Sequence, residues 1–320
     1  MILKPIDNFD VFCEKAEPNI GVFGSKKWLS VYDTKLTIIG IYKDEHQLIG
    51  GFYYLITKKF GLTFLKLPPY TPHCGLFYVS ESKNKSSVNN FSKEIMNEVC
   101  TYFSNQKSAL TVIAFPCNIN DFQPFIWNKY KVIPNYTYRI NLENSIENIK
   151  SHFDTKNRNV INKAIKEEVL VFENTLTKME LFNFFKNSLN TTNANVYENE
   201  LSNIFHKFSD DTNSFSIEAK KNNELLGSVF CIFDKNTCYY LLGGVDKKFG
   251  IQGVNNILIQ YSIEKAKNLG CKTFDFEGSM LKGVEKFFRS FGPDLVPYFT
   301  VNKATLPLEI LLKFKKRELF

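Results

Sequence analysis

The sequence lacks the features that mark several large classes of protein. No apolar stretch approaches the roughly 18 residues that a membrane-spanning helix needs. The first residues include Lys4, Pro5, Asp7 and Asp10, where a secretory peptide would have an apolar segment. The scattered cysteines are Cys13, Cys74, Cys100, Cys117, Cys231, Cys238 and Cys271. Their odd number and the absence of a C-x-x-C pair favour reduced thiols, so we expect a cytoplasmic protein.

Familiar catalytic and cofactor motifs are missing as well. The four histidines have no metal-ligand spacing with one another or with the cysteines, and we expect no metal site. There is no G-x-S-x-G elbow, no Walker loop and no complete dinucleotide fingerprint. His73 and Cys74 are adjacent, and neighbouring residues of an extended chain point to opposite sides. A nucleophile pair of these two residues is therefore not expected.

Apolar and aromatic residues are abundant. The 320 residues are 44% hydrophobic and 15% aromatic, with 31 phenylalanines and 15 tyrosines. This is enough apolar material for two domains of ordinary size. The formal net charge of +7 permits an anionic partner without requiring one.

The first half of the chain predicts a hairpin, a strand, a helix and a further strand. The hairpin follows from two β-branched and aromatic runs that flank a polar turn at 43–46, and the proline-rich loop 68–72 ends the third strand. The expected strands cover residues 36–41, 48–56, 62–67 and 109–115, and the expected helix has its apolar stripe over 91–103.

The second half repeats this order after a strand at 136–142 and a long joining helix over 145–168, capped by Asn144 or Ser145. The expected helices cover 178–188, 198–208 and 254–269, and the expected strands cover 214–219, 225–233, 238–242 and 273–276. Such alternation predicts an α+β fold of two tandem domains, each a mixed β-sheet flanked by helices. The expected boundaries are 1–143 and 144–320, with the joining helix in the second domain.

Two segments of the second half carry candidate chemistry. The turn at 246–256 lies between a strand and a helix, and Gly250 and Gly253 would let backbone N–H groups face a phosphate, or would only let the helix pack closely. The strictly alternating strand at 273–279 places Asp275 and Glu277 on one face. A carboxylate at a strand end can accept a proton from an attacking amine, although a solvated or ion-paired face would look the same.

Four segments resemble known acyltransferases. The glycine turn is similar to the pyrophosphate-binding turn of the GCN5-related N-acetyltransferases (GNAT), with Gln252 in place of a glycine or alanine. Residues 275–279 and 283–292 resemble the C-terminal signature of the FemABX aminoacyltransferases and their BioF2-like acetyltransferase relatives. Residues 156–164 resemble the arginine-containing helix of that family, and 68–75 resemble a segment of its first half. The resemblance implies two tandem GNAT-like domains.

The resemblance also implies roles for single residues. By position, the catalytic candidates are Glu277 and Asp275, the donor-binding candidates are Phe288, Arg289, Gly250 and Gly253, and the acceptor-binding candidates are Arg158, Tyr70 and His73. In the family the position of Arg289 is a lysine. The apolar face of a helix would also explain Phe288, and a solvated basic helix face would explain Arg158.

We therefore expect an acyltransferase that moves an acyl or aminoacyl group from acyl-CoA or aminoacyl-tRNA to an amine of a small-molecule, nucleotide-linked or lipid-linked envelope precursor. No tightly bound cofactor is implied. The alternative is a degenerate, non-catalytic GNAT-fold protein that binds an envelope precursor or a protein partner. The apolar and basic segment 306–320 either packs as a terminal helix or touches an anionic membrane without stable insertion. The oligomeric state stays open.

Overall fold

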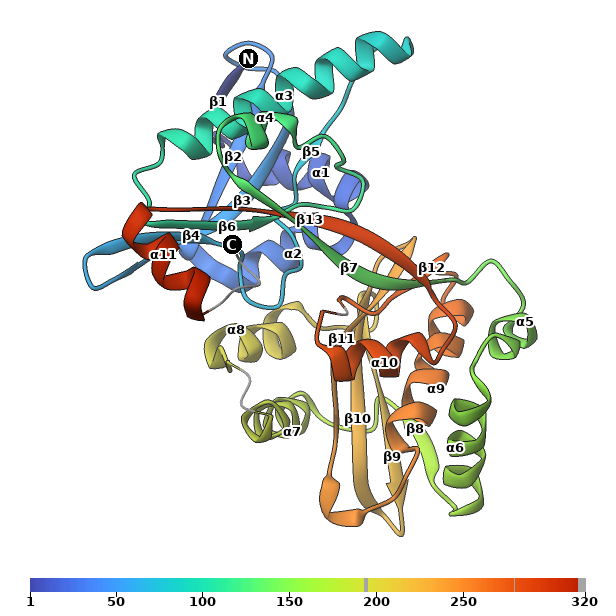
Figure 1. Ribbon diagram of the computed structural model, residues 1–320. Helices are drawn as coiled ribbons and strands as arrows, with labels where there is room; N and C mark the ends of the chain where they lie inside the picture. The colour runs from blue at the N-terminus through green and yellow to red at the C-terminus, as the bar shows by residue number, and fades with distance from the viewer. Residues whose placement is uncertain (193–194, 279, 316–320) are drawn as a thin grey trace. The chain divides into compact units, whose positions relative to one another are not determined.

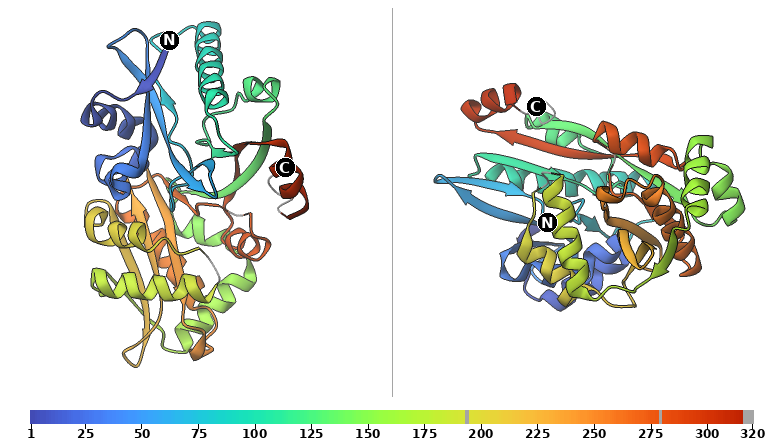
Figure 2. Two further views of the ribbon diagram at one scale, coloured as in Figure 1. Left: turned by 90° about the vertical axis from the view of Figure 1, so that its left-hand side faces the viewer. Right: turned by 90° about the horizontal axis from the view of Figure 1, so that it is seen from below.

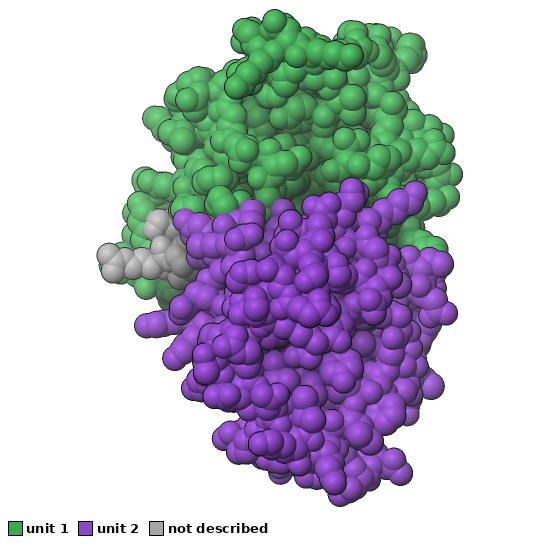
Figure 3. All heavy atoms as spheres, turned by 90° about the vertical axis from the view of Figure 1, so that its right-hand side faces the viewer, with its two compact units in different colours: residues 1–135, 297–320 green, residues 136–296 purple. Residues whose placement is uncertain are grey.

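A computed structural model describes residues 1–192, 195–278 and 280–315 (Figure 1). The chain divides into two units: unit 1 holds residues 1–135 and 297–320, and unit 2 holds residues 136–296 (Figure 3). Both changes of unit fall inside a strand, in β7 (Lys131–Asn141) and in β13 (Asp294–Ala304). This division differs from the predicted boundary at residue 143, because β13 returns to unit 1 and pairs there with β6 (Leu110–Ala114).

Unit 1 is a mixed sheet with helices on both faces. Its sheet has the order β1-β2-β3-β4-β6-β13, with β5 paired to β3. The further elements are β1 (Ile2–Pro5), α1 (Phe9–Ile20), a 3-10 turn (Gly21–Gly24), α2 (Lys26–Leu29), a second 3-10 segment (Ser30–Lys35), β2 (Leu36–Tyr42), β3 (Leu48–Lys59), β4 (Leu62–Lys66), β5 (Phe77–Tyr78), α3 (Lys85–Asn105), α4 (Gln123–Trp127) and α11 (Leu306–Lys315). α1 and α2 cover one face, while α3 and α4 cover the other (Figures 1 and 2).

Unit 2 is built in the same way. Its sheet has the order β7-β12-β11-β10-β9-β8. The further elements are α5 (Ile146–Ser151), α6 (Thr155–Lys166), β8 (Leu170–Glu173), α7 (Lys178–Thr191), α8 (Glu198–Asn203), a π-helical turn (Ile204–Phe208), β9 (Ser214–Lys221), β10 (Glu224–Phe233), β11 (Thr237–Val245), a 3-10 turn (Lys247–Phe249), α9 (Val254–Asn268), β12 (Thr273–Asp275) and α10 (Lys282–Arg289). α7 and α8 cover one face, and α6 and α9 cover the other (Figure 2).

The predicted repetition is confirmed by the strand pairing. In unit 1 the hairpin β2-β3 is followed by β4, α3 and β6, with β4 and β6 parallel over three residue pairs. In unit 2 the hairpin β9-β10 is followed by β11, α9 and β12, with β11 and β12 parallel over three pairs. Each unit then adds an antiparallel strand beside this pair: β13 joins β6, and β7 joins β12. In sequence, β7 follows the elements of unit 1 but pairs with β12 of unit 2, and β13 follows the elements of unit 2 but pairs with β6 of unit 1. Each unit therefore receives its last strand from the part of the chain that follows the other unit.

The predicted joining helix over 145–168 is two helices. α5 ends at Ser151, and α6 begins at Thr155 after Asp154, whose carboxylate accepts a hydrogen bond from the Asn157 backbone N–H at 2.6 Å. A capping aspartate satisfies N–H groups at the start of a new helix, which ends the preceding helical run. The apolar stripe expected along this segment is confirmed for Ile149, Phe153, Ile161 and Ala164, which are buried in the core of unit 2, but the expectation is wrong for Ile165, which is 53% exposed.

Candidate active site

The candidate site lies where the parallel pairing of β11 and β12 stops, at Asp275, the last residue of β12. The two strands are in register from Thr237 with Thr273 to Tyr239 with Asp275, after which β11 continues to Val245. The chain leaves the sheet at Glu277, which has a φ of +55°, and Gly278, which has a φ of +122°. A non-glycine residue with positive φ is uncommon, and such strained positions gather at functional sites.

Asp275 is a fully engaged carboxylate. Its Oδ1 accepts hydrogen bonds from the Thr137 hydroxyl at 2.6 Å and from the Glu277 backbone N–H at 2.9 Å, and its Oδ2 pairs with Arg139 Nε at 2.7 Å. Thr137 in turn accepts a hydrogen bond from the Gly278 backbone N–H at 3.0 Å. Asp275 therefore fixes the turn that carries Glu277, and we assign it a positioning role.

Glu277 has the opposite environment. Its Oε1 is shut off from solvent and has no hydrogen-bond partner among the described residues. Burial, reinforced by the nearby negative charge of Asp275, raises the pKa of the Glu277 carboxyl well above its ordinary value. Two neighbouring carboxyls in such different surroundings are the arrangement expected of a proton acceptor and the group that positions it.

A second polar cluster lies on α10. Glu285 Oε1 accepts hydrogen bonds from the Tyr138 hydroxyl at 2.9 Å and from Arg289 Nε at 2.7 Å. The Arg289 and Tyr138 donors lower the pKa of the Glu285 carboxyl, which therefore stays charged. The side chain of Arg289 remains 62% exposed, so its guanidinium is held at one edge and open to an anionic ligand.

Phe288 is placed in the core of unit 2. Its ring centroid lies 4.7 Å from that of Phe276 and 5.6 Å from that of Tyr240, and the residue is only 6% exposed. These contacts are those of the apolar helix face, so the structure gives Phe288 a packing role. A contact between Phe288 and the donor stays a prediction.

The two predicted glycines, Gly250 and Gly253, lie in the turn before α9, and the space around them differs. Gly250 has a φ of +62° and open space where a Cβ would lie. Gly253, with a φ of +87°, precedes α9, and a Cβ there would lie 2.3 Å from the Val160 carbonyl oxygen of α6. No described side chain caps this helix start, which leaves its first N–H groups available to an anion. Lys163 of α6 reaches the turn and donates to Gln252 Oε1 at 3.3 Å.

Arg158 has a structural role that the sequence did not indicate. Its Nη1 donates to the carbonyl oxygens of Ser151 at 3.0 Å and Phe153 at 2.9 Å, and Nη2 donates to the Thr155 hydroxyl at 3.3 Å. The guanidinium thus ties the end of α5 to the start of α6. Nη1 already donates to two backbone carbonyls, and the predicted contact of Arg158 with the acceptor stays a prediction.

Tyr70 and His73 lie in unit 1, on the loop that follows β4. Tyr70 has a φ of +59°, and His73 Nδ1 accepts a hydrogen bond from the Gly75 backbone N–H at 3.1 Å. The loop is held by Trp28, whose Nε1 donates to the Thr71 hydroxyl at 3.1 Å. The other seven predicted residues lie in unit 2: Glu277, Asp275, Phe288, Arg289, Gly250, Gly253 and Arg158. Their binding and catalytic roles remain predictions.

Four residues of this site were not found from the sequence: Thr137, Tyr138, Arg139 and Glu285. The usable signal was the alternation along β7. Thr137 and Arg139 share one face of this strand and meet Asp275, while Tyr138 faces the other side and meets Glu285.

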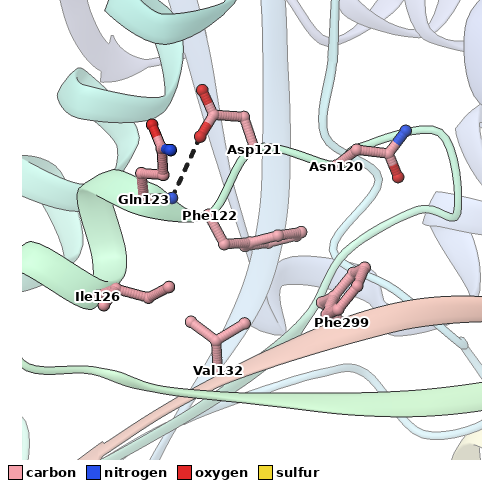
Figure 4. A pocket seen from close by; sticks show the side chains of 7 residues that line it. All are labelled: Asn120, Asp121, Phe122, Gln123, Ile126, Val132 and Phe299. Atoms are coloured by element: carbon pink, nitrogen blue, oxygen red, sulfur yellow. Dashed lines mark hydrogen bonds between the residues drawn. The ribbon is translucent and has the colours of Figure 1, made fainter.

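Unit 1 also contains an open pocket of about 440 Å³ (Figure 4). The rings of Phe122 and Phe299 pack against each other in its wall, with centroids 5.0 Å apart, and Ile126 and Val132 are the other apolar lining residues. Asp121 at the rim accepts a hydrogen bond from the Gln123 backbone N–H at 3.1 Å and pairs with Lys93. None of the predicted site residues lines this pocket, and its paired carboxylate offers no free proton acceptor.

Comparison with known proteins gives a family match within unit 2. The family model described as an acetyltransferase (GNAT) domain matches residues 180–289, which include Asp275, Glu277 and α10. None of the curated proteins matches the sequence. Among the described helices, none has the length and apolar character needed to cross a membrane.

Three solved structures share the fold. FemX is 13% identical, covers 98% of this chain and 100% of its own, and has a TM-score of 0.60. The C-terminal domain of a putative lysylphosphatidylglycerol synthetase from Agrobacterium fabrum is 9% identical, covers 95% and 96%, and has a TM-score of 0.59. A tandem GNAT protein from the clavulanic acid biosynthesis pathway is 6% identical, covers 94% and 98%, and has a TM-score of 0.53. The expected fold of tandem GNAT-like domains is confirmed, and the likeness to FemX is a likeness of fold.

Proposed function

We propose that this chain is an acyltransferase that moves an acyl or aminoacyl group from an activated ester or thioester to an amine, with Glu277 as the proton acceptor. The match of residues 180–289 to the model of an acetyltransferase (GNAT) domain supports this proposal. The observation that carries the proposal is the half-buried Glu277 beside Asp275, with its Oε1 shut off from solvent and without a hydrogen-bond partner among the described residues. A general base is most effective when its pKa lies near the working pH, and burial moves the pKa of Glu277 in that direction.

The proposed chemistry needs no covalent enzyme intermediate. The amine nitrogen attacks the donor carbonyl carbon, a C–N bond forms, and the C–S or C–O bond to the leaving group breaks. The amine proton passes to Glu277, directly or through a water molecule, and the leaving group takes up a proton as it departs. Holding the two reactants in contact supplies much of the acceleration.

The remaining residues have supporting roles in this proposal. Asp275 holds the backbone of Glu277 and the guanidinium of Arg139. The uncapped start of α9, with Gly250, Gly253 and Lys163, offers N–H groups and a cation to the phosphates of an acyl-CoA, the donor that a GNAT domain implies. Arg289 offers its exposed edge to an anionic part of the donor. The acceptor is an amine-bearing small molecule, with Tyr70 and His73 as proposed contacts.

The test is donor consumption by the purified chain. One arm supplies acetyl-CoA and measures thiol release, and the other supplies aminoacyl-tRNA and measures loss of the aminoacyl group, each with a panel of amine acceptors. The proposal requires acceptor-dependent consumption of one donor that Glu277→Gln removes and that Glu224→Gln, at an exposed carboxylate of β10, leaves intact. Tight donor binding without turnover would instead support the non-catalytic binding protein.

A further inference from the structure

The C-terminal helix α11 leaves its apolar residues uncovered. None of the residues of α11 is buried, although most are apolar. Leu306, Ile310 and Phe314 are four residues apart, so they form one stripe along the helix, and they are 72%, 50% and 86% exposed. Leu308 and Leu312, on the other side, are half-buried. The face that a packing helix would bury is therefore the face that α11 exposes.

Lysines flank this stripe on both sides. At about 100° per residue, Leu311, which is 47% exposed, widens the apolar stripe beyond Phe314. Lys313 lies next to Leu306 at one edge of the widened stripe, and Lys315 lies next to Leu311 at the other edge. Lys313 pairs with Glu309 at 2.9 Å, and both lysines are exposed. Apolar side chains bordered by lysines are the pattern of a helix that lies in a membrane interface.

The turn between β3 and β4 also exposes an apolar side chain next to lysines. Lys59 pairs with Leu62, so the turn consists of Phe60 and Gly61, whose φ angles are +52° and +72°. Positive φ at both positions defines a type I′ turn, for which asparagine is preferred at the first position. The β9-β10 turn has that preferred residue, with Asn222 and Asn223 at +51° and +64°.

A phenylalanine at position 60 is therefore unfavourable for the backbone conformation of the turn. Its side chain does not pack against the protein either, since the residue is 89% exposed. Lys59 Nζ lies 5.3 Å from its ring, and Lys58 and Lys59 are exposed. A strained, exposed aromatic residue at a turn tip points to an external ligand rather than to folding.

Backbone hydrogen bonds place this turn and α11 at the same end of the unit 1 sheet. The Ala109 N–H donates to the Thr63 carbonyl at 2.7 Å, and the Thr305 N–H donates to the Ala109 carbonyl at 2.9 Å. Thr63 lies two residues after Gly61 of the turn, and Thr305 immediately precedes α11. Both elements lie at that end in the views of Figures 1 and 2. We call residues 58–62 together with 306–315 the Phe60–Phe314 surface.

We propose that the Phe60–Phe314 surface binds peripherally to a bilayer of anionic phospholipid. Phe60, Leu306, Ile310 and Phe314 enter the boundary between headgroups and acyl chains, and the lysines contact lipid phosphates. Residues 58–62 and 306–315 contain four lysines and one carboxylate, Glu309. Burial of apolar side chains and attraction of lysines to an anionic surface act together in such binding.

The same features disfavour other occupants. A symmetric contact with a second copy would bring the lysines of one chain against those of the other, because a twofold interface repeats the same patch. Nucleic acid is bound through basic side chains on the phosphates and through rings that stack on bases, whereas three apolar residues of this surface, Leu62, Leu306 and Ile310, are aliphatic and cannot stack. Aliphatic side chains of this kind gain most from a lipid interior.

The experiment is co-sedimentation of the full chain with unilamellar vesicles of phosphatidylcholine alone and of phosphatidylcholine with 30% phosphatidylglycerol, at low and high salt. We expect binding to the anionic vesicles that weakens as salt rises. Phe314→Ser and Phe60→Ser should each weaken it by about tenfold. Lys313→Glu with Lys315→Glu should lower binding to anionic vesicles by more than tenfold and leave binding to neutral vesicles unchanged.

Matched controls lie at the opposite end of the same unit. Val79→Ser removes an apolar residue that is 51% exposed, and Lys83→Glu with Lys85→Glu reverses two exposed lysines. These controls should bind like the unchanged chain. In a second measurement, tryptophan fluorescence of Phe314→Trp should shift to the blue and be quenched by brominated lipid only with anionic vesicles.

Four results would overturn the proposal. They are absence of binding to anionic vesicles, equal loss in the control variants, binding that Phe60→Ser and Phe314→Ser leave intact, and a lipid-free dimer that these two variants dissociate. None of these measurements involves acyl transfer, so the proposed function and this inference stand or fall separately.

Discussion

The parallel strand pairs of the two units can be compared residue by residue. In unit 2 the last pair is Tyr239 with Asp275, and in unit 1 it is Lys66 with Val112. Two positions further along, unit 2 has Glu277 and unit 1 has Ala114. Unit 1 thus has small or apolar residues at the positions where unit 2 has two carboxyls.

The helix that connects the two strands of each pair also differs between the units, at its N-terminus. α3 in unit 1 begins after Asn84, whose side chain accepts a hydrogen bond from the Ser87 N–H at 3.1 Å. α9 in unit 2 begins after Gly253, without a side-chain cap among the described residues. One scaffold therefore occurs in two forms. Among the described residues, unit 2 has a helix start without a side-chain cap and an unpartnered Glu277 Oε1, whereas unit 1 has a capped helix and Ala114 at the corresponding places. The difference between the units lies in a few side chains and not in the order of elements.

The largest expected effect is that of Glu277→Gln. Glutamine fits the same space but cannot accept the proton, so kcat should fall by about 100-fold to 10,000-fold while the fold is retained. Because only the ionised carboxylate acts as a base, kcat/KM of the unchanged chain should rise with pH through the raised pKa of Glu277, and the variant should lose that limb.

Donor consumption measured from pH 5 to pH 9 tests this prediction, with circular dichroism as the control for folding. A variant that keeps the full rate would show that the carboxyl difference between the units has no catalytic meaning. The unchanged pH profile of Glu224→Gln provides the matched reference.

The next largest effect is expected for Asp275→Val, which gives unit 2 the residue of unit 1. The change leaves the Thr137 hydroxyl and Arg139 Nε without their acceptor, and the free energy of unfolding should fall by about 3 kcal/mol. Adding Arg139→Leu removes the cation that has lost the Asp275 carboxylate and should recover part of that loss. Urea denaturation of both variants measures the effect, with Asp211→Val at an exposed turn as the control. Equal stability of the single and double variants would contradict a coupled pair.

The order of elements could be predicted because it depends on local patterns. Alternation and the turn at 221–223 predict β9-β10, and the spacing of Ile95, Val99 and Phe103 predicts α3. The apolar stripe over 91–103 does not predict the first turns of α3, because the segment after Asn84 is polar. The helix begins there because the side chain of Asn84 caps it. The segment before residue 36 was left unassigned, and it contains β1 and α1.

The candidate site could be predicted only in part, for a different reason. Asp275 and Glu277 are two residues apart in sequence, so their proximity is local. Their opposite environments depend on Thr137 and Arg139, which are more than a hundred residues away and reach Asp275 only through the pairing of β7 with β12. Arg158 was expected to be free for a ligand because the break between α5 and α6, which provides its carbonyl partners, has no strong sequence signal.

A smaller effect distinguishes the two glycines of the α9 turn. Gly253→Ala places a methyl group against the Val160 carbonyl at a position with positive φ, so we expect a loss of about 2 to 3 kcal/mol in stability and a displaced α9 start. Gly250→Ala has only the backbone strain, about 1 kcal/mol, because its surroundings are open. Thermal unfolding and donor affinity measure both changes. Equal losses at the two positions would mean that the close approach of α6 to α9 does not constrain this turn.

The smallest expected effect concerns the two type I′ turns, one in each unit. Phe60→Asn gives the β3-β4 turn the residue type of the β9-β10 turn, and relief of the positive φ should stabilise the chain by about 0.5 to 1 kcal/mol. Asn222→Phe should destabilise it by a similar amount. Urea denaturation measures both. If the phenylalanine at position 60 is kept for a ligand, Phe60→Asn gains stability and loses vesicle binding together. A variant that loses both would show that the ring is needed for folding, and the contrast between the turns would then be structural.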